Sequence, residues 1–285
     1  MKKLSFTKMH GLGNDYVYIN CLEQDIDDPS AIAQFVSNRH FGIGSDGLVL
    51  IKPSQRGDAR MQMFNSDGSE SEMCGNAIRC VAKYLHDEGL VTGSLATIET
   101  LAGDLPIEII TENGTATGAR VNMGAPRLNG PDIPVTINKN PVAMEPVSIT
   151  DDNTGQCSNL QFTAVSMGNP HAVFFVEAVT DYHIHTLGPK LEVHPLFPKR
   201  TNVEFARIIN RSEIEMRVWE RGTGETLACG TGACATAVAA HLNGMTDTTV
   251  QLHLLGGTLQ IEISNDTVFM TGPAKRVFDG VVYTP

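Results

Sequence analysis

Short apolar stretches alternate with polar turns along most of the chain, a pattern that is typical of β-structure. The turns are rich in Gly, Asn, Asp and Ser, residues that reverse the backbone readily. Residues 8–19 read as a glycine-rich turn that feeds an apolar strand. Further strands are predicted at 48–51, 61–64, 96–100, 105–110 and 117–123.

Other stretches have the pattern of helices. Apolar residues recur at helical spacing over 78–85, and Gly89 supplies a C-terminal stop. Residues 233–242 contain neither Pro nor Gly and are almost entirely small or apolar, which predicts a helix that begins after Gly232 and is buried on most sides. A third stretch, 30–39, has moderate helical character.

The same order of elements occurs twice, which indicates an internal duplication. In each copy a loop that ends in Cys-Gly precedes a helix. The period is far longer than the ~20–50 residues of solenoid repeats, so whole domains are repeated. A shift of 155 residues places Gly13-Asn14 on Gly168-Asn169, Cys74-Gly75 on Cys229-Gly230 and Gly89 on Gly244, and a shift of 154 places 105–109 on 259–263.

Duplicated units of this kind predict an α/β fold of the α+β type. We expect two pseudo-symmetric domains, each a mostly antiparallel sheet wrapped around a central helix. Five prolines between residues 126 and 146 mark the junction, because proline breaks regular elements. The N-terminal domain then covers 1–124 and the C-terminal domain 125–273. The ligand site is expected in the cleft between them, since ligand sites favour domain interfaces.

Composition narrows the class of protein. A chain of 285 residues with 41% hydrophobic and 19% charged residues is an ordinary globular protein of about two domains. The net charge of −11 argues against nucleic acid or an anionic membrane as partner, although a small anionic ligand can still find a locally positive pocket. The N-terminus lacks the apolar core of a signal peptide, and no run approaches the ~18–20 apolar residues that span a bilayer. We therefore expect a cytoplasmic protein.

Six cysteines are present, and none forms a C-x-x-C pair. The nine histidines show no zinc-ligand spacing beside them, so we expect no metal site. A disulfide framework is not expected in a reducing cytosol. Cys80 and Cys234 lie inside the predicted helices and are expected to be core residues, while Cys21 and Cys157 carry no signal.

Cys74 and Cys229 differ from the other four because each comes directly before a predicted helix. Backbone N–H groups at a helix N-terminus bind anions and lower the pKa of a neighbouring thiol. Two such thiols on opposite faces of one carbon can invert its configuration, because the thiolate removes a proton and the thiol returns one on the far face. Three other interpretations stay open: a disulfide between the two cysteines, a four-thiolate metal site with Cys80 and Cys234, and core packing.

The motifs around these cysteines resemble those of the diaminopimelate epimerases, which are cofactor-independent amino-acid epimerases of lysine and peptidoglycan-precursor biosynthesis. The pair of cysteine motifs with flanking asparagines is specific evidence for this family, whereas either glycine-rich loop alone would be weak evidence. The matching segments cover nearly the whole chain in the expected order: Gly11–Asp15, Phe64–Ser69, Met73–Ala77, Met123–Pro126, Met167–His171, Thr201–Phe205, Trp219–Gly222 and Ala228–Gly232.

The resemblance implies an isomerase that uses neither pyridoxal phosphate nor a metal, and that converts LL-2,6-diaminopimelate to the meso form by a two-base mechanism. Cys74 and Cys229 are then the acid–base catalysts. His171 lies near them, as support or as a direct participant. Glu220 and Asn65 hold the reacting ammonium. The backbone N–H groups that hold the reacting carboxylate belong to Gly75, Asn76, Gly230 and Thr231.

The resemblance also implies a site for the distal amino-acid end of the substrate, formed by Asn14, Asn169, Asn202 and Arg221. Arg suits a carboxylate because it can form a bidentate pair, and asparagine can both donate and accept. The tail, 274–285, is expected to return to the N-terminal domain.

Two positions depart from the family pattern. Gly47 stands where the family often has Gln, so a substrate contact there is lost or is made by the backbone. Phe278 stands where some members carry a Tyr that is linked to dimer formation, which leaves a homodimer possible but open.

Other functions fit parts of the pattern. A proline or hydroxyproline racemase shares the paired cysteines and the fold, but its substrate has no second amino-acid end for Arg221 and the asparagines to hold. A redox-sensing binding protein needs both thiols but not Glu220. A phenazine-type isomerase of the same fold lacks the cysteine pair.

Overall fold

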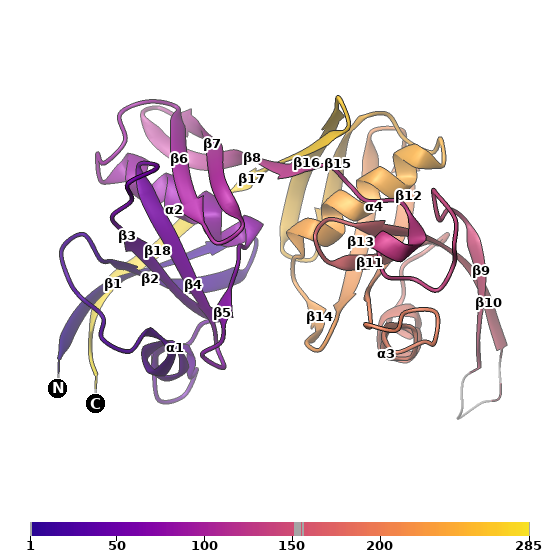
Figure 1. Ribbon diagram of the computed structural model, residues 1–285, viewed down its shortest axis with the longest axis horizontal. Helices are drawn as coiled ribbons and strands as arrows, with labels where there is room; N and C mark the ends of the chain where they lie inside the picture. The colour runs from indigo at the N-terminus through magenta and orange to yellow at the C-terminus, as the bar shows by residue number, and fades with distance from the viewer. Residues whose placement is uncertain (1, 151–154, 156, 285) are drawn as a thin grey trace. The chain divides into compact units, whose positions relative to one another are not determined.

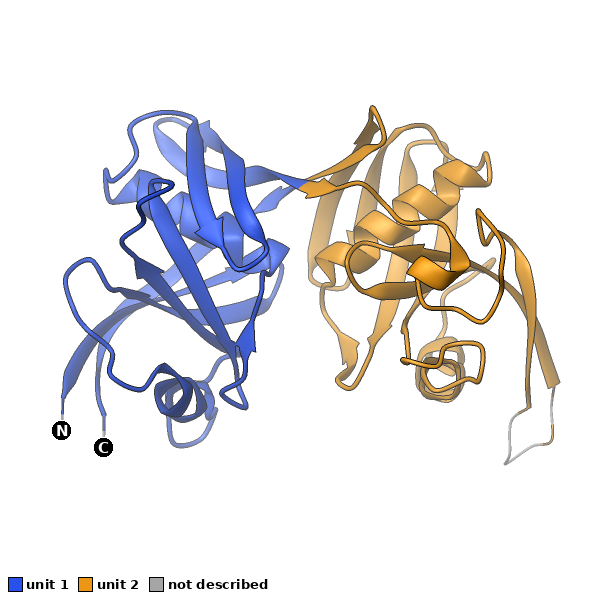
Figure 2. Cartoon of the chain, viewed as in Figure 1, with its two compact units in different colours: residues 1–122, 271–285 blue, residues 123–270 orange. Residues whose placement is uncertain are grey.

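The computed structural model describes residues 2–150, 155 and 157–284 (Figure 1). The chain divides into two compact units (Figure 2). Unit 1 comprises residues 1–122 and 271–285, and unit 2 comprises residues 123–270. The described chain is mostly strand with few helices, so the predicted α+β class is confirmed.

Unit 1 is built on a largely antiparallel strand ladder. Its strands, of which β8 runs past the unit boundary, are β1 (Lys3–Gly11), β2 (Asn14–Asn20), β3 (Gly47–Lys52), β4 (Ala59–Asn65), β5 (Glu70–Ser71), β6 (Leu95–Thr100), β7 (Gly103–Glu112), β8 (Thr115–Gly124) and β18 (Lys275–Tyr283). They pair in the order β18-β1-β2-β3-β4-β6-β7-β8. The pairs β2–β3 and β4–β6 are parallel, and β5 adds a short antiparallel pairing to β4.

Unit 2 repeats this ladder. Its strands are β9 (Glu145–Thr150), β10 (Cys157–Ser166), β11 (Pro170–Phe175), β12 (Asn202–Asn210), β13 (Glu213–Glu220), β14 (Gly224–Thr226), β15 (Thr249–Leu254), β16 (Gly257–Ser264) and β17 (Thr267–Pro273), the last of which runs past the boundary. The order β9-β10-β11-β12-β13-β15-β16 has its parallel pairs, β11–β12 and β13–β15, at the places that correspond to those of unit 1. The predicted duplication is confirmed.

One long helix lies inside each unit against its strands (Figure 1). These are α2 (Gly75–Asp87) and α4 (Gly230–Leu242), which are related by the same 155-residue shift. Both are buried along most of their length. A large apolar side chain buried in this way, such as Ile78 or Leu85 of α2, contributes roughly 1.5–3 kcal/mol to the free energy of unfolding. The shorter helical segments are α1 (Pro29–Ser37), η1 (Gly130–Asp132), η2 (Tyr182–Leu187) and α3 (Gly188–Glu192).

Some predicted boundaries were wrong. Helix α4 begins at Gly230 rather than after Gly232. Glycine disfavours a helix mainly in its interior, so it is tolerated at the first helical position. The glycine-rich stretch before β2 is a tight hairpin, and the residues before it form strand β1. Apolar and polar residues do not alternate regularly along β1, because most of its residues are buried where the strand lies between β2 and β18.

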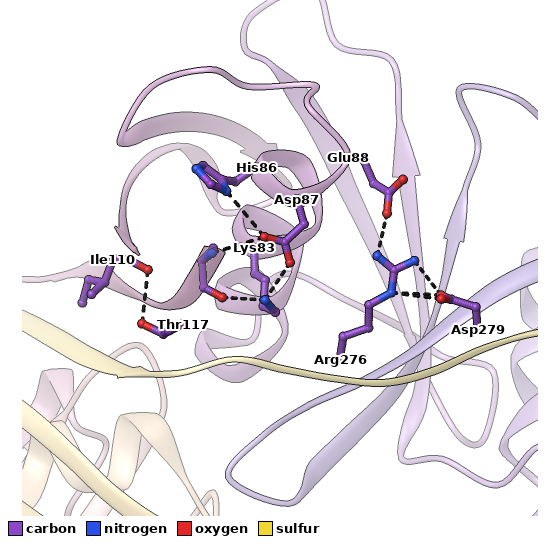
Figure 3. Close-up of polar contacts among 9 residues, drawn as sticks. Lys83, His86, Asp87, Glu88, Ile110, Thr117, Arg276 and Asp279 are labelled. Carbon is purple, nitrogen blue, oxygen red and sulfur yellow. Dashed lines mark hydrogen bonds and ion pairs between the residues drawn. The ribbon is translucent and has the colours of Figure 1, made fainter. Parts of the chain in front are cut away.

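The C-terminal strand is tied to α2 through charged groups (Figure 3). Arg276 on β18 pairs with Glu88, directly after α2, at 2.6 Å and with Asp279 at 2.7 Å. On the same helix, the buried Lys83 pairs with Asp87 and donates to the carbonyl of Ala116 (Figure 3). The ion pair with Glu88 ties the C-terminal strand to the end of α2, and the pairing of β18 with β1 places the N-terminal strand beside it.

Candidate active site

Cys74 and Cys229 are the N-cap residues of α2 and α4. Both have extended backbone conformations, so each side chain lies at the start of its helix. The N–H groups of the first helical turn have no partners within the helix. These N–H groups can therefore hold an anion. They belong to Gly75 and Asn76 beside the Cys74 thiol, and to Gly230 and Thr231 beside the Cys229 thiol. The predicted placement of both cysteines at helix starts is confirmed.

In unit 1 the Cys74 thiol lies against an asparagine. Its Sγ donates to Asn14 Oδ1 at 3.6 Å, and the Asn76 amide donates to the same oxygen at 3.3 Å. Asn14 follows the β1–β2 hairpin, whose two turn residues have positive φ. The Asn14 amide nitrogen in turn donates to Asp46 Oδ2 at 2.8 Å. We call Cys74, Asn14, Asn76 and Asp46 the Cys74 cluster.

Two other residues of unit 1 take no part in the hydrogen bonds of this cluster. Asn65 is exposed at the end of β4, and its amide donates to Ser69 at 3.0 Å. Gly47 opens β3 in a tight place, where a Cβ would lie 2.1 Å from the carbonyl oxygen of Phe64. No larger residue fits at 47 on this backbone, so any ligand contact there is limited to the main chain.

In unit 2 the Cys229 thiol is surrounded by acidic groups. Cys229 is 6% exposed, and its thiol is hydrogen-bonded to Glu220. Its sulfur accepts from the Gly232 N–H at 3.4 Å. Burial raises the pKa of Cys229 well above its usual value, and the charges of Glu220 and Glu204 raise it further. The expectation that the helix terminus lowers this pKa was wrong, because desolvation and two carboxylates outweigh the helix N–H groups.

Glu220 is itself perturbed. Burial raises the pKa of this carboxyl above its usual value of 4.5, against the opposing effect of its bond to the Thr226 hydroxyl. A carboxyl group beside a thiol in a partly dehydrated place can exchange protons with it or with a bound ammonium.

Glu204 is a site residue that the sequence analysis missed. Its Oε1 lies 2.6 Å from His171 Nδ1, both side chains have no exposed surface, and Oε2 has no hydrogen-bond partner among the described residues. A Cβ at Gly232 would lie 2.7 Å from Glu204 Oε1, so the carboxylate packs against the first turn of α4. A signal was available, since a Glu at 204 interrupts an otherwise apolar strand segment. We call Cys229, Glu220, Glu204 and His171 the Cys229 cluster.

The remaining candidates of unit 2 surround this cluster. The amide oxygen of Asn169 lies 3.0 Å from His171 Nε2. Asn202 is buried and bridges the backbone, donating to the Pro170 carbonyl and accepting from the Arg221 N–H, each at 2.9 Å. The Arg221 side chain is exposed and donates to the carbonyl of residue 199. Asn202 thus fixes the backbone from which Arg221 projects.

The other cysteines carry no comparable surroundings. Cys80 and Cys234 are fully buried, as predicted for core residues, and burial raises the pKa of Cys80 to about 11. Within residues 2–150, 155 and 157–284, no group of three or more His, Cys, Asp or Glu side chains is arranged to hold a metal ion. None of the described helices is long and apolar enough to cross a membrane.

The sequence matches a known family over most of its length. The family model for diaminopimelate epimerase aligns with residues 6–129 and 163–277. The chain belongs to the diaminopimelate epimerase family. It is 54% identical over 281 residues to a diaminopimelate epimerase of Acetivibrio thermocellus, covering 98% of each chain. It is 53% identical to one of Desulfovibrio desulfuricans, with 98% of each covered, and 51% identical to one of Methanococcus maripaludis strain S2, with 98% and 99% covered.

Solved structures confirm the fold of this epimerase family member. A phenazine biosynthesis protein of the PhzF family from Bacillus anthracis matches with a TM-score of 0.68 at 16% identity, covering all of both chains. A hydroxyproline epimerase from Agrobacterium vitis matches with a TM-score of 0.66 at 14% identity, covering 99% of this chain and 91% of that one. At these identities the likeness concerns the fold alone. The enzyme is an isomerase by its family membership.

Proposed function

We propose that the protein converts LL-2,6-diaminopimelate to the meso form without pyridoxal phosphate or a metal, in lysine and peptidoglycan-precursor biosynthesis. The observation that carries the proposal is the pair of free cysteines at equivalent helix N-caps in a chain of this family. Relatives that are about half identical over their full length are named for this reaction.

The reaction we propose is a two-base proton transfer. Backbone N–H groups of the first helical turns hold the α-carboxylate; they are those of Gly75, Asn76, Gly230 and Thr231. They stabilise the negative charge that spreads onto the carboxylate from the α-carbon. One cysteine, as thiolate, takes the α-proton and becomes a thiol. The other, as thiol, gives its proton to the opposite face and becomes a thiolate, so charge and proton count balance.

The charges around the thiols support different roles in the first turnover. Burial and two carboxylates keep Cys229 protonated, which favours it as the proton donor. Cys74 is then the acceptor. After one turnover the two protonation states are exchanged, and the reverse reaction restores them.

We assign the polar residues to the two ends of the substrate. Glu220 and Asn65 hold the reacting ammonium, and His171 supports the catalytic pair. Asn169 and Arg221 hold the distal end, where Asn202 fixes the position of Arg221. Asn14, assigned by resemblance to the distal end, contacts the reacting Cys74 thiol, and this favours the reacting end instead.

The alternatives predict different substrates. A racemase acting on proline or hydroxyproline has no use for a distal amino-acid site. The deciding experiment incubates the purified protein with diaminopimelate and, separately, with proline in deuterated water. We expect deuterium at the α-carbon of the product from diaminopimelate and none from proline. Turnover of proline alone would establish the racemase, and turnover of neither with reversible thiol oxidation would favour the redox protein.

Three further features are proposed with this function. The domains divide near 124/125 with the tail 274–285 in the first, which the units 1–122 with 271–285 and 123–270 support. The enzyme works in the cytoplasm, where its thiols stay reduced.

A homodimer forms through β18, since this strand pairs with β1 and exposes apolar side chains at Val277, Phe278, Val281 and Tyr283. Light scattering of the wild type and Val281→Lys tests the dimer, and equal masses would argue against it.

A further inference from the structure

A directed chain of hydrogen bonds passes through the Cys74 cluster. At one end is Arg79, which is fully buried and whose Nη2 donates to Asn76 Oδ1 at 2.9 Å. The Asn76 amide nitrogen donates to Asn14 Oδ1 at 3.3 Å. The Asn14 amide nitrogen donates to Asp46 Oδ2 at 2.8 Å.

The two ends fix the direction of every bond between them. A guanidinium can only donate and an ionised carboxylate can only accept. Asn76 must therefore turn its oxygen to Arg79, and Asn14 must turn its nitrogen to Asp46. The amide oxygen of Asn14 is left on the side of Cys74, where it accepts from the thiol at 3.6 Å. The orientation follows from chemistry and not from how the amide atoms are assigned.

Both ends of the chain are themselves held. Arg79 also donates to the carbonyl oxygens of Gly75, at 3.0 Å, and Pro273, at 3.3 Å. Space for the guanidinium comes from Gly11, where a Cβ would lie 2.9 Å from Arg79 Nη2. Asp46 Oδ1 accepts from Arg39 at 2.9 Å, and Asp46 Oδ2 also accepts from the backbone N–H of residue 15 at 3.1 Å.

Unit 2 has no copy of this arrangement. The 155-residue shift carries Arg79 onto Cys234, Asn76 onto Thr231 and Asp46 onto Thr201, none of which is charged. The orientation of Asn14 is thus a property of unit 1 alone and not a general consequence of the repeated fold.

We propose that Asp46 is a positioning residue that holds the Asn14 oxygen toward Cys74, so that this asparagine receives a substrate ammonium and rejects a carboxylate. An ammonium donates to that oxygen, whereas a carboxylate would meet it oxygen to oxygen. The ammonium also displaces the thiol from its acceptor and brings positive charge to the sulfur, which favours the thiolate once substrate is bound. The kinetic part of this proposal rests on the proposed function.

Variants at position 46 separate the acceptor from the charge. Asp46→Ala removes the acceptor and frees Asn14 to turn its nitrogen toward the sulfur. Asp46→Asn removes the charge but keeps one oxygen that can accept from Asn14. Arg39→Gln is the matched control, because it removes the ion pair of the same carboxylate while the side chain of Asp46 still accepts.

The first measurement is the rate of Cys74 alkylation by iodoacetamide against pH, followed by mass spectrometry of the peptide that contains it. Tyr18 and Cys80 interact electrostatically with this thiol, and the hydrogen-bonded chain adds Arg79 and Asp46, with Arg39 and Asp15 beside Asp46. The variants change Asp46 or its partner Arg39 and leave the other groups in place. In Asp46→Ala the profile should move to lower pH and the rate near neutral pH should rise several-fold. Asp46→Asn and Arg39→Gln should stay within about twofold of wild type.

The second measurement is the KM for diaminopimelate. Loss of one hydrogen bond to a charged group should raise it about tenfold in Asp46→Ala, with a smaller change in Asp46→Asn. If all three substitutions raised the KM equally, Asp46 would only stabilise its loop, and the proposal would be overturned. The alkylation result stands even if diaminopimelate is not the substrate, so the two ideas can fail separately.

A measurement on the wild type covers the case in which Asp46→Ala does not fold. With the Asn14 side-chain amide labelled with nitrogen-15, its protons should show a nuclear Overhauser contact to the backbone N–H of Asp15, which shares the acceptor Asp46 Oδ2. A contact to the Cys74 β-protons without one to Asp15 means the opposite orientation and rules the proposal out.

Discussion

Cys74 and Cys229 occupy the same place in the two units, as N-cap residues of thirteen-residue helices, but their neighbours differ in charge. The Cys74 cluster puts amide groups against the thiol, with Arg79 behind them. The Cys229 cluster puts two carboxylates there, Glu220 and Glu204. Duplication supplied one backbone twice, and the side chains around it distinguish the two thiols chemically. The comparison teaches that two equivalent helix ends can place their cysteines among neighbours of different charge.

The 155-residue shift shows which substitutions create the difference. Tyr16 of one copy corresponds to His171, Val49 to Glu204 and Asn65 to Glu220. Each of these changes puts an ionisable group near the second cysteine in place of a neutral side chain. A buried polar pair such as His171–Glu204 is weak evidence of stabilisation, because burial of polar groups costs desolvation energy. Its retention in unit 2 therefore fits a functional role better than a stabilising one.

The largest expected effect comes from removing either thiol. Cys74→Ala and Cys229→Ala should each lower kcat for epimerisation by a factor on the order of 10³ or more, since a positioned acid or base contributes ~10²–10⁴-fold. Chiral chromatography of the product measures this. Cys157→Ser, at an exposed thiol, is the control and should keep wild-type activity. Normal turnover by either alanine variant would return that cysteine to a structural role.

Arg221→Ala should raise the KM for diaminopimelate about tenfold or more with less change in kcat. The reason is that a lost charged hydrogen bond costs about 1.5–3 kcal/mol of binding free energy. Steady-state kinetics give the separation. Arg211→Gln, which breaks an exposed ion pair with Asp247, is the matched control. An unchanged KM would remove Arg221 from the distal site.

Glu220→Gln should lower activity and raise stability, and the second effect should depend on pH. Burial raises the folded-state pKa of Glu220, so the folded chain binds more protons than the unfolded chain between the two pKa values. Wild-type stability therefore falls as pH rises from the unfolded-state pKa of 4.5 through the raised folded-state pKa. Glu220→Gln lacks this fall.

Urea unfolding of wild type and Glu220→Gln at pH 4, 6 and 8 tests this. The advantage of the variant in free energy of unfolding should be absent at the lowest pH and should grow with pH. An advantage that is constant across the range would mean that the carboxyl group is not strained by burial.

The smallest expected effect concerns the buried thiols. Cys234→Ala removes one sulfur from the fully buried face of α4 and should lower the free energy of unfolding by about 1 kcal/mol, because a small cavity is left. Its kcat should match wild type. A large loss of activity would mean that this cysteine takes part in the chemistry, contrary to its placement.

Much of the fold could be predicted from the chain because the information was local or repeated. The periodic apolar residues of α2, the Cys-Gly steps and the 155-residue shift placed the duplicated units and both helix starts. Strand β1 was missed because its buried residues are set by pairing partners at both edges, one of which lies at the far end of the chain.

The candidate site was harder to predict where a side chain acts through another. Glu204 was missed because its role depends on His171, which a parallel strand pairing brings beside it. The acidity of Cys229 was predicted in the wrong direction, since helix position can be read from sequence but the surrounding carboxylates cannot. Asp46 was visible only as a turn residue until Arg79, thirty-three positions later, defined the direction of the hydrogen bonds.

The pairing of β18 with β1 has a consequence for synthesis on the ribosome. The strand that completes the first unit consists of residues 275–283, which are translated after all of unit 2. Until those residues are made, unit 1 stays incomplete, with the outer edge of β1 uncovered. The half that is made first is finished last. A chain that stops before residue 275 should expose that edge to other chains and put the N-terminal half at risk of aggregation.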